Sequence, residues 1–138
     1  MKAKFLVLLL TVLTFALIFA GCDSRVTRDE AKEQTNLFLN AVEDKNYDLA
    51  KTYLHPQRPI DVKALTERAE LNLGIDFSKG IEITRYTDFS SSVYDSEVDG
   101  SEYELEIDAI VGGVSIEINV EIVRNDQGFG IYGIEFDD

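Results

Sequence analysis

The sequence predicts an α+β domain, with about three N-terminal helices packed on a curved antiparallel sheet of four to five strands. Apolar residues recur at helical spacing between positions 27 and 74. From position 81 onward they alternate with polar residues, as in strands with one buried face. Gly112 and Gly113 separate the two longest alternating runs, which indicates a tight hairpin. Helices followed by such strands are typical of α+β domains.

The predicted helices carry end signals. Thr27 is the expected N-cap of the first helix, and Glu30 three residues later completes a capping box. A short second helix is expected in "NYDLAKTYL", and the prolines of "HPQRP" end it. A third helix begins at Asp61 and ends at Gly74, which is a plausible C-cap.

The predicted strands form a meander. "GIEITRYTDF" alternates loosely, whereas "SEYELEIDAIV" and "VSIEINVEIV" alternate strictly. "NDQG" indicates the next turn, and "FGIYGIEF" the last strand, with a bulge expected near Gly133. The side chains expected to face the helices from the two strict strands are Tyr103, Leu105, Ile107, Ala109, Val111, Val114, Ile116, Ile118, Val120 and Ile122.

The first 22 residues predict where in the cell the protein is located. Lys2 and Lys4 precede an apolar run over positions 5–19, which is shorter than the ~20 residues of a membrane span and typical of a signal peptide. The run ends in "FAGC", which resembles the lipobox of bacterial lipoproteins. This resemblance implies cleavage after position 21, lipidation (palmitate among the acyl groups) of Cys22, and anchoring at the extracytoplasmic face of the cell membrane. A tether over 22–26 and one domain over 27–138 would follow.

Asp23 adds one further expectation about location. Directly after the lipidated cysteine, it resembles the inner-membrane retention signal of double-membraned bacteria, which implies the periplasmic side of the inner membrane there. Cys22 is the only cysteine, so no intramolecular disulfide is expected.

Charge narrows the class of partner. All 26 acidic residues but only 11 of the 13 basic ones follow the apolar run. Nucleic acid is not an expected partner, because its binding relies on basic residues that neutralise phosphates. Basic residues cluster near the tether at Arg25, Arg28 and Lys32, and the sequence from position 95 on is strongly acidic. We expect the basic end to lie near anionic headgroups and the acidic sheet to point away.

A second resemblance concerns the helices. The stretch "FLNAVEDKNYDLAKTYLHP", residues 38–56, is similar to the helical hairpin of small bacterial lipoproteins with a nuclear-transport-factor-like, cystatin-like cone domain. The resemblance implies a curved sheet wrapped around helices, often with a pocket at the mouth of the cone. That class includes enzymes, scaffolds and binding proteins, so the fold does not decide the function.

The stretch "DSEVDGSEYELE", residues 95–106, has nearly the acidic spacing of a calcium loop. A strand follows it where such a loop needs a helix, and Asp99–Gly100 is a strong hairpin turn. We therefore expect a hairpin in which Tyr94 faces Leu105. In that register Asp95 lies opposite Glu104, and Glu97 lies opposite Glu102.

The same alternation places acidic residues together on the outer face of the sheet. Across the Gly112–Gly113 hairpin we expect Glu104 opposite Glu121, Glu106 opposite Asn119 and Asp108 opposite Glu117. This face is interpreted either as a solvated surface or as a docking face for a basic partner or a diffuse cation site. No metal or cofactor is expected. The residues of this predicted acidic face are Asp95, Glu97, Glu102, Glu104, Glu106, Asp108, Glu117 and Glu121.

Material for catalysis is sparse, and no catalytic residue is predicted. His55 is the only histidine, and a C-terminal helix cap accounts for it. Cone-fold enzymes resembling ketosteroid isomerase need an inward carboxylate, for which Asp76 and Asp88 are the options.

The sequence therefore favours a non-enzymatic binding or accessory module, with a basic protein at the acidic face or a small apolar ligand between sheet and helices. The alternatives are a small isomerase-like enzyme, or an inhibitor or immunity protein that opposes a basic enzyme through Glu102, Glu104 and Glu121.

Overall fold

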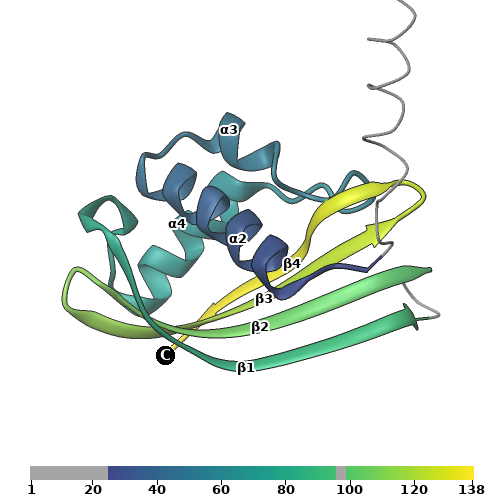
Figure 1. Cartoon of the computed structure of the whole chain (residues 1–138). Helices are drawn as coiled ribbons and strands as arrows, with labels where there is room; N and C mark the ends of the chain where they lie inside the picture. The colour runs from purple at the N-terminus through teal and green to yellow at the C-terminus, as the bar shows by residue number, and fades with distance from the viewer. Residues whose placement is uncertain (1–24, 96–98) are drawn as a thin grey trace, which may run out of the picture.

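The computed structural model describes residues 25–95 and 99–138. Helices precede an antiparallel sheet and cover one of its faces, so the predicted α+β class is confirmed (Figure 1). The elements are α2 (Arg28–Glu43), α3 (Tyr47–Lys51), α4 (Val62–Leu73), the 3-10 turn η1 (Phe77–Lys79), β1 (Ile81–Asp95), β2 (Gly100–Val111), β3 (Val114–Asn125) and β4 (Gly128–Asp137).

The start of α2 and both ends of α4 follow the predicted signals, whereas α3 already ends at Lys51, before the prolines that were expected to end it. The Thr27 hydroxyl accepts from the Glu30 backbone N–H, and the Glu30 carboxylate accepts from the Thr27 N–H, which forms the expected capping box. Asp61 caps α4 in the same way through the Ala64 N–H. At the other end of α4, Gly74 adopts a left-handed conformation with a φ of 66°, which suits a glycine C-cap.

The sheet has the order β1-β2-β3-β4, as a meander requires. Gly112 and Gly113 both have positive φ, and Val111 pairs with Val114 across them, so the predicted two-residue hairpin is confirmed. Asn125 pairs with Gly128 across the next predicted turn. β4 is bulged beside Gly133, also as predicted: Ile131 pairs with Ile122 and Gly133 with Glu121, which leaves Tyr132 as the extra residue.

The β1–β2 pairing corrects one expectation. A hairpin forms, but Gly100 already pairs with Asp95, so Asp99–Gly100 is not a two-residue turn. Leu105 pairs with Phe89 rather than with Tyr94, a shift of five positions. As a result, two glutamates of β2 lie opposite serines of β1: Glu104 pairs with Ser90, and Glu102 pairs with Ser92. At these two positions the register avoids like charges directly opposite each other, which destabilise a sheet, although Asp88 still pairs with Glu106. The side chain of Asp95, and Glu97 as a whole, lie outside the described part of the chain.

The β4 edge is covered by the chain that leaves α3. Leu54 forms a parallel bridge to Ile131, with the His55 N–H donating to the Ile131 carbonyl at 2.8 Å and the Ile131 N–H to the Tyr53 carbonyl at 2.9 Å. Gly130 allows this approach, because a Cβ there would lie 2.6 Å from the Leu54 carbonyl carbon.

The core fills the space between the helices and the inner sheet face. The inward positions predicted on β2 and β3 are buried except Tyr103, which is half-buried, and Val114, which is exposed. Val26 is also buried, and its N–H donates to the Ser101 hydroxyl at 2.9 Å. The chain is thus held by the sheet from position 26 on. The helix residues of this core include Ala31, Phe38, Leu39, Ala41, Val42, Ala50, Val62 and Ala69.

Candidate binding groove on the outer face of the sheet

Acidic side chains on the outer face stand in three rows that cross the strands. Adjacent positions on neighbouring strands bring them together, because alternate residues of each strand share a face. The predicted pairs Glu104–Glu121, Glu106–Asn119 and Asp108–Glu117 are confirmed. From β1 to β4 the rows are Ser90–Glu104–Glu121–Gly133, Asp88–Glu106–Asn119–Glu135 and Arg85–Asp108–Glu117–Asp137.

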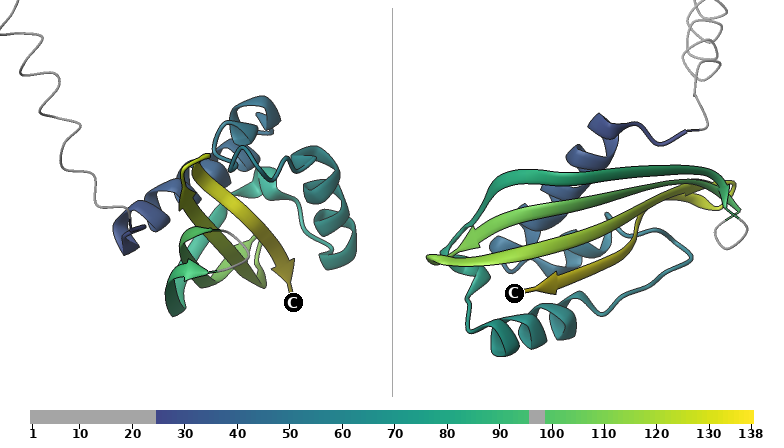
Figure 2. Two further views of the ribbon diagram at one scale, coloured as in Figure 1. Left: turned by 90° about the vertical axis from the view of Figure 1, so that its right-hand side faces the viewer. Right: turned by 90° about the horizontal axis from the view of Figure 1, so that it is seen from below.

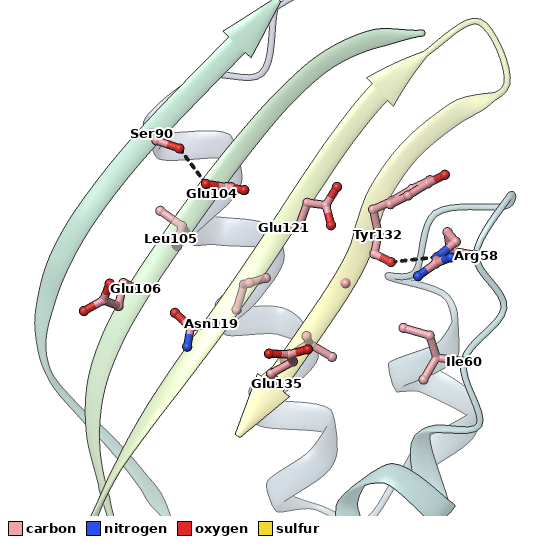
Figure 3. A pocket seen from close by; sticks show the side chains of 13 residues that line it. Arg58, Ile60, Ser90, Glu104, Leu105, Glu106, Asn119, Glu121, Tyr132 and Glu135 are labelled. Atoms are coloured by element: carbon pink, nitrogen blue, oxygen red, sulfur yellow. Dashed lines mark hydrogen bonds between the residues drawn. The ribbon is translucent and has the colours of Figure 1, made fainter. Parts of the chain in front are cut away.

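The residues of the first two rows other than Asp88 form the floor of a groove of about 480 Å³. Figure 3 shows the floor side chains standing on the face turned away from the helices, with Arg58 and Ile60 beyond β4. We call this hollow the acidic groove. Its lining residues are Arg58, Ile60, Ser90, Glu104, Leu105, Glu106, Asn119, Val120, Glu121, Tyr132, Gly133, Ile134 and Glu135.

The wall of the acidic groove comes from the bulge of β4 and the loop between α3 and α4. Arg58 Nε donates to the Tyr132 carbonyl at 3.4 Å, and its guanidinium lies 5.1 Å from the Tyr132 ring centroid. Gly133 keeps the floor open, since a Cβ there would lie 3.0 Å from the Glu121 carboxylate. The wall therefore offers one cation, one aromatic ring and the apolar Ile60.

Hydroxyl groups donate hydrogen bonds to two of the carboxylates on the groove floor. The Ser90 hydroxyl donates to the Glu104 carboxylate at 2.7 Å, and the Thr87 hydroxyl to Glu106 at 3.0 Å. Hydroxyl donors orient these carboxylates without neutralising them, so the floor keeps its negative charge. Within the described residues, no basic side chain lies within 4.0 Å of the carboxylates of Glu104, Glu106 or Glu135.

The third row is better compensated. Arg85 donates to the Asp108 carboxylate from both Nε and Nη2, at 3.1 and 2.8 Å, and Asn119 donates to Glu117 at 2.9 Å. Asp108 and Glu117 do not line the acidic groove. The predicted acidic face thus divides into a part that lines the acidic groove, with Glu104, Glu106 and Glu121, and a part beside it in which Arg85 and Asn119 hold Asp108 and Glu117.

Sequence reasoning did not assign the wall residues Arg58, Ile60 and Tyr132, or the floor residue Glu135, to a site. Glu135 follows the alternation of β4. Aligning β4 with β3 in the sequence would therefore have placed it on the outer face. Arg58 and Tyr132 were not readable in this way, because their meeting depends on the long-range bridge from Leu54 to Ile131. Gly130, which permits that bridge, was the available signal.

His55 corrects a further expectation. It is 1% exposed and does not cap a helix. Its Nε2 lies 3.1 Å from the Asn125 carboxamide oxygen, and its Nδ1 accepts the Gln57 N–H at 3.1 Å. This pattern assigns the neutral tautomer with the proton on Nε2. His55 also packs edge-on against Tyr132, with 5.5 Å between the ring centroids, and so supports the groove wall.

Asp76 does not line the acidic groove. Its carboxylate accepts from the Ser78 hydroxyl at 2.6 Å and the Ser78 N–H at 3.0 Å, and Lys45 lies 3.7 Å away. The hydrogen bonds from Ser78 are the main reason that the pKa of Asp76 lies below its ordinary value. Asp76 is therefore a surface cap of η1. The side chain of Asp88 lies outside the described residues.

The described residues, within 25–95 and 99–138, contain neither a metal-binding cluster nor a membrane-spanning helix. No group of three or more histidine, cysteine or acidic side chains in these ranges is arranged to hold a metal ion. None of the helices in them has the length and apolar character needed to cross a bilayer.

Comparison with known proteins adds no relative. No protein-family model, curated protein or solved structure matches the chain.

Proposed function

We propose that this protein is a lipid-anchored binding module at the extracytoplasmic face of a bacterial membrane, and that its acidic groove holds a basic segment of a partner protein. The "FAGC" sequence supports the anchor. The observation that carries the binding role is the composition of the groove: Glu104, Glu106, Glu121 and Glu135 line the floor, against the single wall cation Arg58.

The chemistry of the groove favours a peptide over a bare cation. Carboxylates on a strand face accept from lysine or arginine, while Tyr132 and Ile60 offer apolar contact to the methylene stems of such side chains. Arg58 at the wall would repel a basic side chain of the peptide that came close to it. This repulsion limits the positions in which the peptide can bind along the groove. Electrostatic attraction of this kind contributes mainly to the association rate and to specificity.

The inner side of the sheet supports this choice over a small-molecule enzyme. Apart from its half-buried edges, it is packed with apolar side chains from both layers. Asp76, a candidate for an inward acid, caps a surface turn instead.

A defined probe tests the proposal. The detergent-solubilised full-length protein is titrated with a fluorescent lysine- and arginine-rich peptide at low and high salt, and anisotropy gives the Kd. We expect saturable binding that weakens as salt rises. Glu104→Gln, Glu121→Gln and Glu135→Gln combined should weaken it roughly tenfold, from three contacts worth about 0.5 kcal/mol each.

The matched control removes the same charge elsewhere. Glu33, Asp44 and Glu82 are exposed and lie outside the acidic groove. Their triple amide variant should keep the wild-type Kd within about twofold, because exposed distant charges are largely screened. Equal weakening by both triple variants would show that net charge, not the groove, attracts the peptide. If only the groove variant weakens binding, native mass spectrometry of the protein with solubilised envelope would identify the natural partner.

A further inference from the structure

A second surface lies where α2 leans on β1. The Arg28 guanidinium lies 3.7 Å from the centroid of the Phe89 ring, and Lys32 Nζ lies 4.2 Å from the centroid of the Tyr86 ring. The two rings stack on each other with 5.8 Å between centroids, and the Tyr86 hydroxyl donates to Asn36. We call Arg28, Lys32, Tyr86 and Phe89 the basic–aromatic patch.

The cations of this patch are held by rings rather than by acids. Within the described residues, neither Arg28 nor Lys32 lies within 4.0 Å of a carboxylate, whereas Arg85 and Arg124 each pair with one. A ring face attracts a cation without neutralising it. Arg28 is exposed and Lys32 half-exposed, so both positive charges remain available to an outside anion.

The patch lies beside the start of the folded chain. Arg28 is the first residue of α2, and Val26 is fixed two residues earlier by its bond to Ser101. Four residue steps join Cys22 to Val26, a reach of ~14 Å when extended. The right-hand view in Figure 2 shows the N-terminal end of α2 projecting past β1, on the side opposite α4. A lipid on Cys22 would bring this side to the bilayer.

The neighbouring surface of α2 is unsuited to the same contact. Asp29 and Glu33 are exposed and follow each other at helical spacing on the solvent side of α2. Anionic headgroups would repel this stripe and attract the stripe of Arg28 and Lys32. The two stripes together select one orientation. Aromatic rings beside basic groups also suit the boundary between headgroups and acyl chains.

We infer that the basic–aromatic patch docks on the anionic surface of the bilayer, with headgroup phosphates bound by Arg28 and Lys32. This inference rests on the lipid anchor of the proposed function and adds the membrane-facing surface. The acidic groove starts at Ser90 on β1 and reaches Arg58 and Ile60 beyond β4, so its far end then lies away from the membrane and stays open to a partner.

A fluorescence experiment tests the orientation, since the chain contains no tryptophan. The lipidated full-length protein is reconstituted in vesicles that contain phospholipids brominated in the upper acyl chain, which quench nearby tryptophan. Phe89→Trp reports on the patch and keeps a ring beneath Arg28. Leu71→Trp reports on α4, where Leu71 is 83% exposed. Vesicles are either zwitterionic or contain anionic phosphatidylglycerol.

We expect strong quenching of Phe89→Trp in anionic vesicles, weaker quenching in zwitterionic ones, and little quenching of Leu71→Trp in either. Arg28→Gln with Lys32→Gln should lower the ratio of docked to undocked orientations roughly 30-fold, since each basic side chain at an anionic surface changes that ratio about 5-fold. Arg68→Gln with Lys79→Gln removes the same charge from exposed sites elsewhere and should leave the quenching unchanged.

The failures are distinguishable. Equal quenching at positions 89 and 71, or no effect of the Arg28 and Lys32 changes, would overturn the docking surface while the anchor stands. Mass spectrometry of the same preparation reports the lipid on Cys22. A Cys22 without lipid would overturn the anchor, and the docking surface with it.

Discussion

Arg124 and Glu30, 94 positions apart, form a two-point ion pair that joins the end of β3 to the first turn of α2, with Nη2–Oε1 at 2.9 Å and Nη1–Oε2 at 3.3 Å. The same guanidinium donates to the Arg25 carbonyl at 3.1 Å and lies 4.4 Å from the Phe129 ring centroid. One side chain therefore fixes the entry of the chain into the fold.

Acid should weaken this junction. Burial raises the pKa of Glu30, but hydrogen bonds from Arg124 and Thr27 outweigh it, so the pKa lies below its ordinary value of 4.5. A lowered carboxylate pKa stabilises the fold above the unfolded pKa, and this contribution is lost as pH falls through the folded pKa. Glu30→Gln should lose about 0.5–1 kcal/mol at neutral pH and show a flatter acid limb. Urea unfolding from about pH 6 to about pH 3 measures this. If the stability of Glu30→Gln fell as steeply in acid as that of the wild type, the role of Glu30 would be contradicted. Glu33→Gln, at an exposed position, is the control.

The buried His55 should matter for stability and for the groove wall. His55→Leu leaves the Gln57 N–H without its acceptor and takes one partner from Asn125. We expect a loss of about 1–3 kcal/mol in the free energy of unfolding and weaker peptide binding, because the support of Tyr132 goes too. Gln57→Ala removes only the exposed bond to Asn125 and should cost at most about 0.5 kcal/mol. Equal losses in the two variants would refute the role assigned to the imidazole.

Gly130 should tolerate no side chain. A Cβ at this position meets the backbone of Leu54 and His55 at 2.6–2.7 Å, and backbone cannot rotate away as a side chain can. Gly130→Ala should displace the strand-like segment at residues 53–55 and cost about 2–4 kcal/mol, measured by thermal unfolding. Gly113→Ala meets no atom within 4 Å but has a φ of 88°, so about 1–2 kcal/mol is expected there. A smaller loss at Gly130 than at Gly113 would contradict the close approach.

Repulsion between carboxylates of the acidic groove should destabilise the fold when no partner is bound. Glu104 stands directly opposite Glu121, and like charges so placed destabilise a sheet. Glu104→Gln should therefore raise the free energy of unfolding by about 0.3–0.5 kcal/mol at low salt, and the gain should shrink as salt screens the pair. The same variant should bind the basic peptide more weakly. Opposite signs in folding and binding would mark Glu104 as a binding residue, whereas a loss in both would point to a structural role.

The sequence was most informative where local chemistry decides the structure. Gly112 and Gly113 predicted the β2–β3 hairpin, and the pairs that follow from it lie in the predicted register. The β1–β2 register was missed because β1 contains three irregularities, which a period of two does not reveal. The outer acidic face was predicted, but its wall was not, because Arg58 reaches Tyr132 only through the three-dimensional arrangement.

The attachment of the N-terminal segment also has a mechanical consequence. Val26 is bonded to Ser101 of β2, and the Arg25 carbonyl to Arg124 of β3, so tension applied at Arg25 is shared between the backbone path into α2 and two bonds to the central strands. Each of those strands is held along both sides by neighbours. Peeling a sheet from its rim breaks one rung after another, whereas pulling on an inner strand loads many rungs at once. A pull at Arg25 should therefore load these two bonds before α2 can unwind, and the rupture force should fall when Ser101 or Arg124 is replaced by alanine.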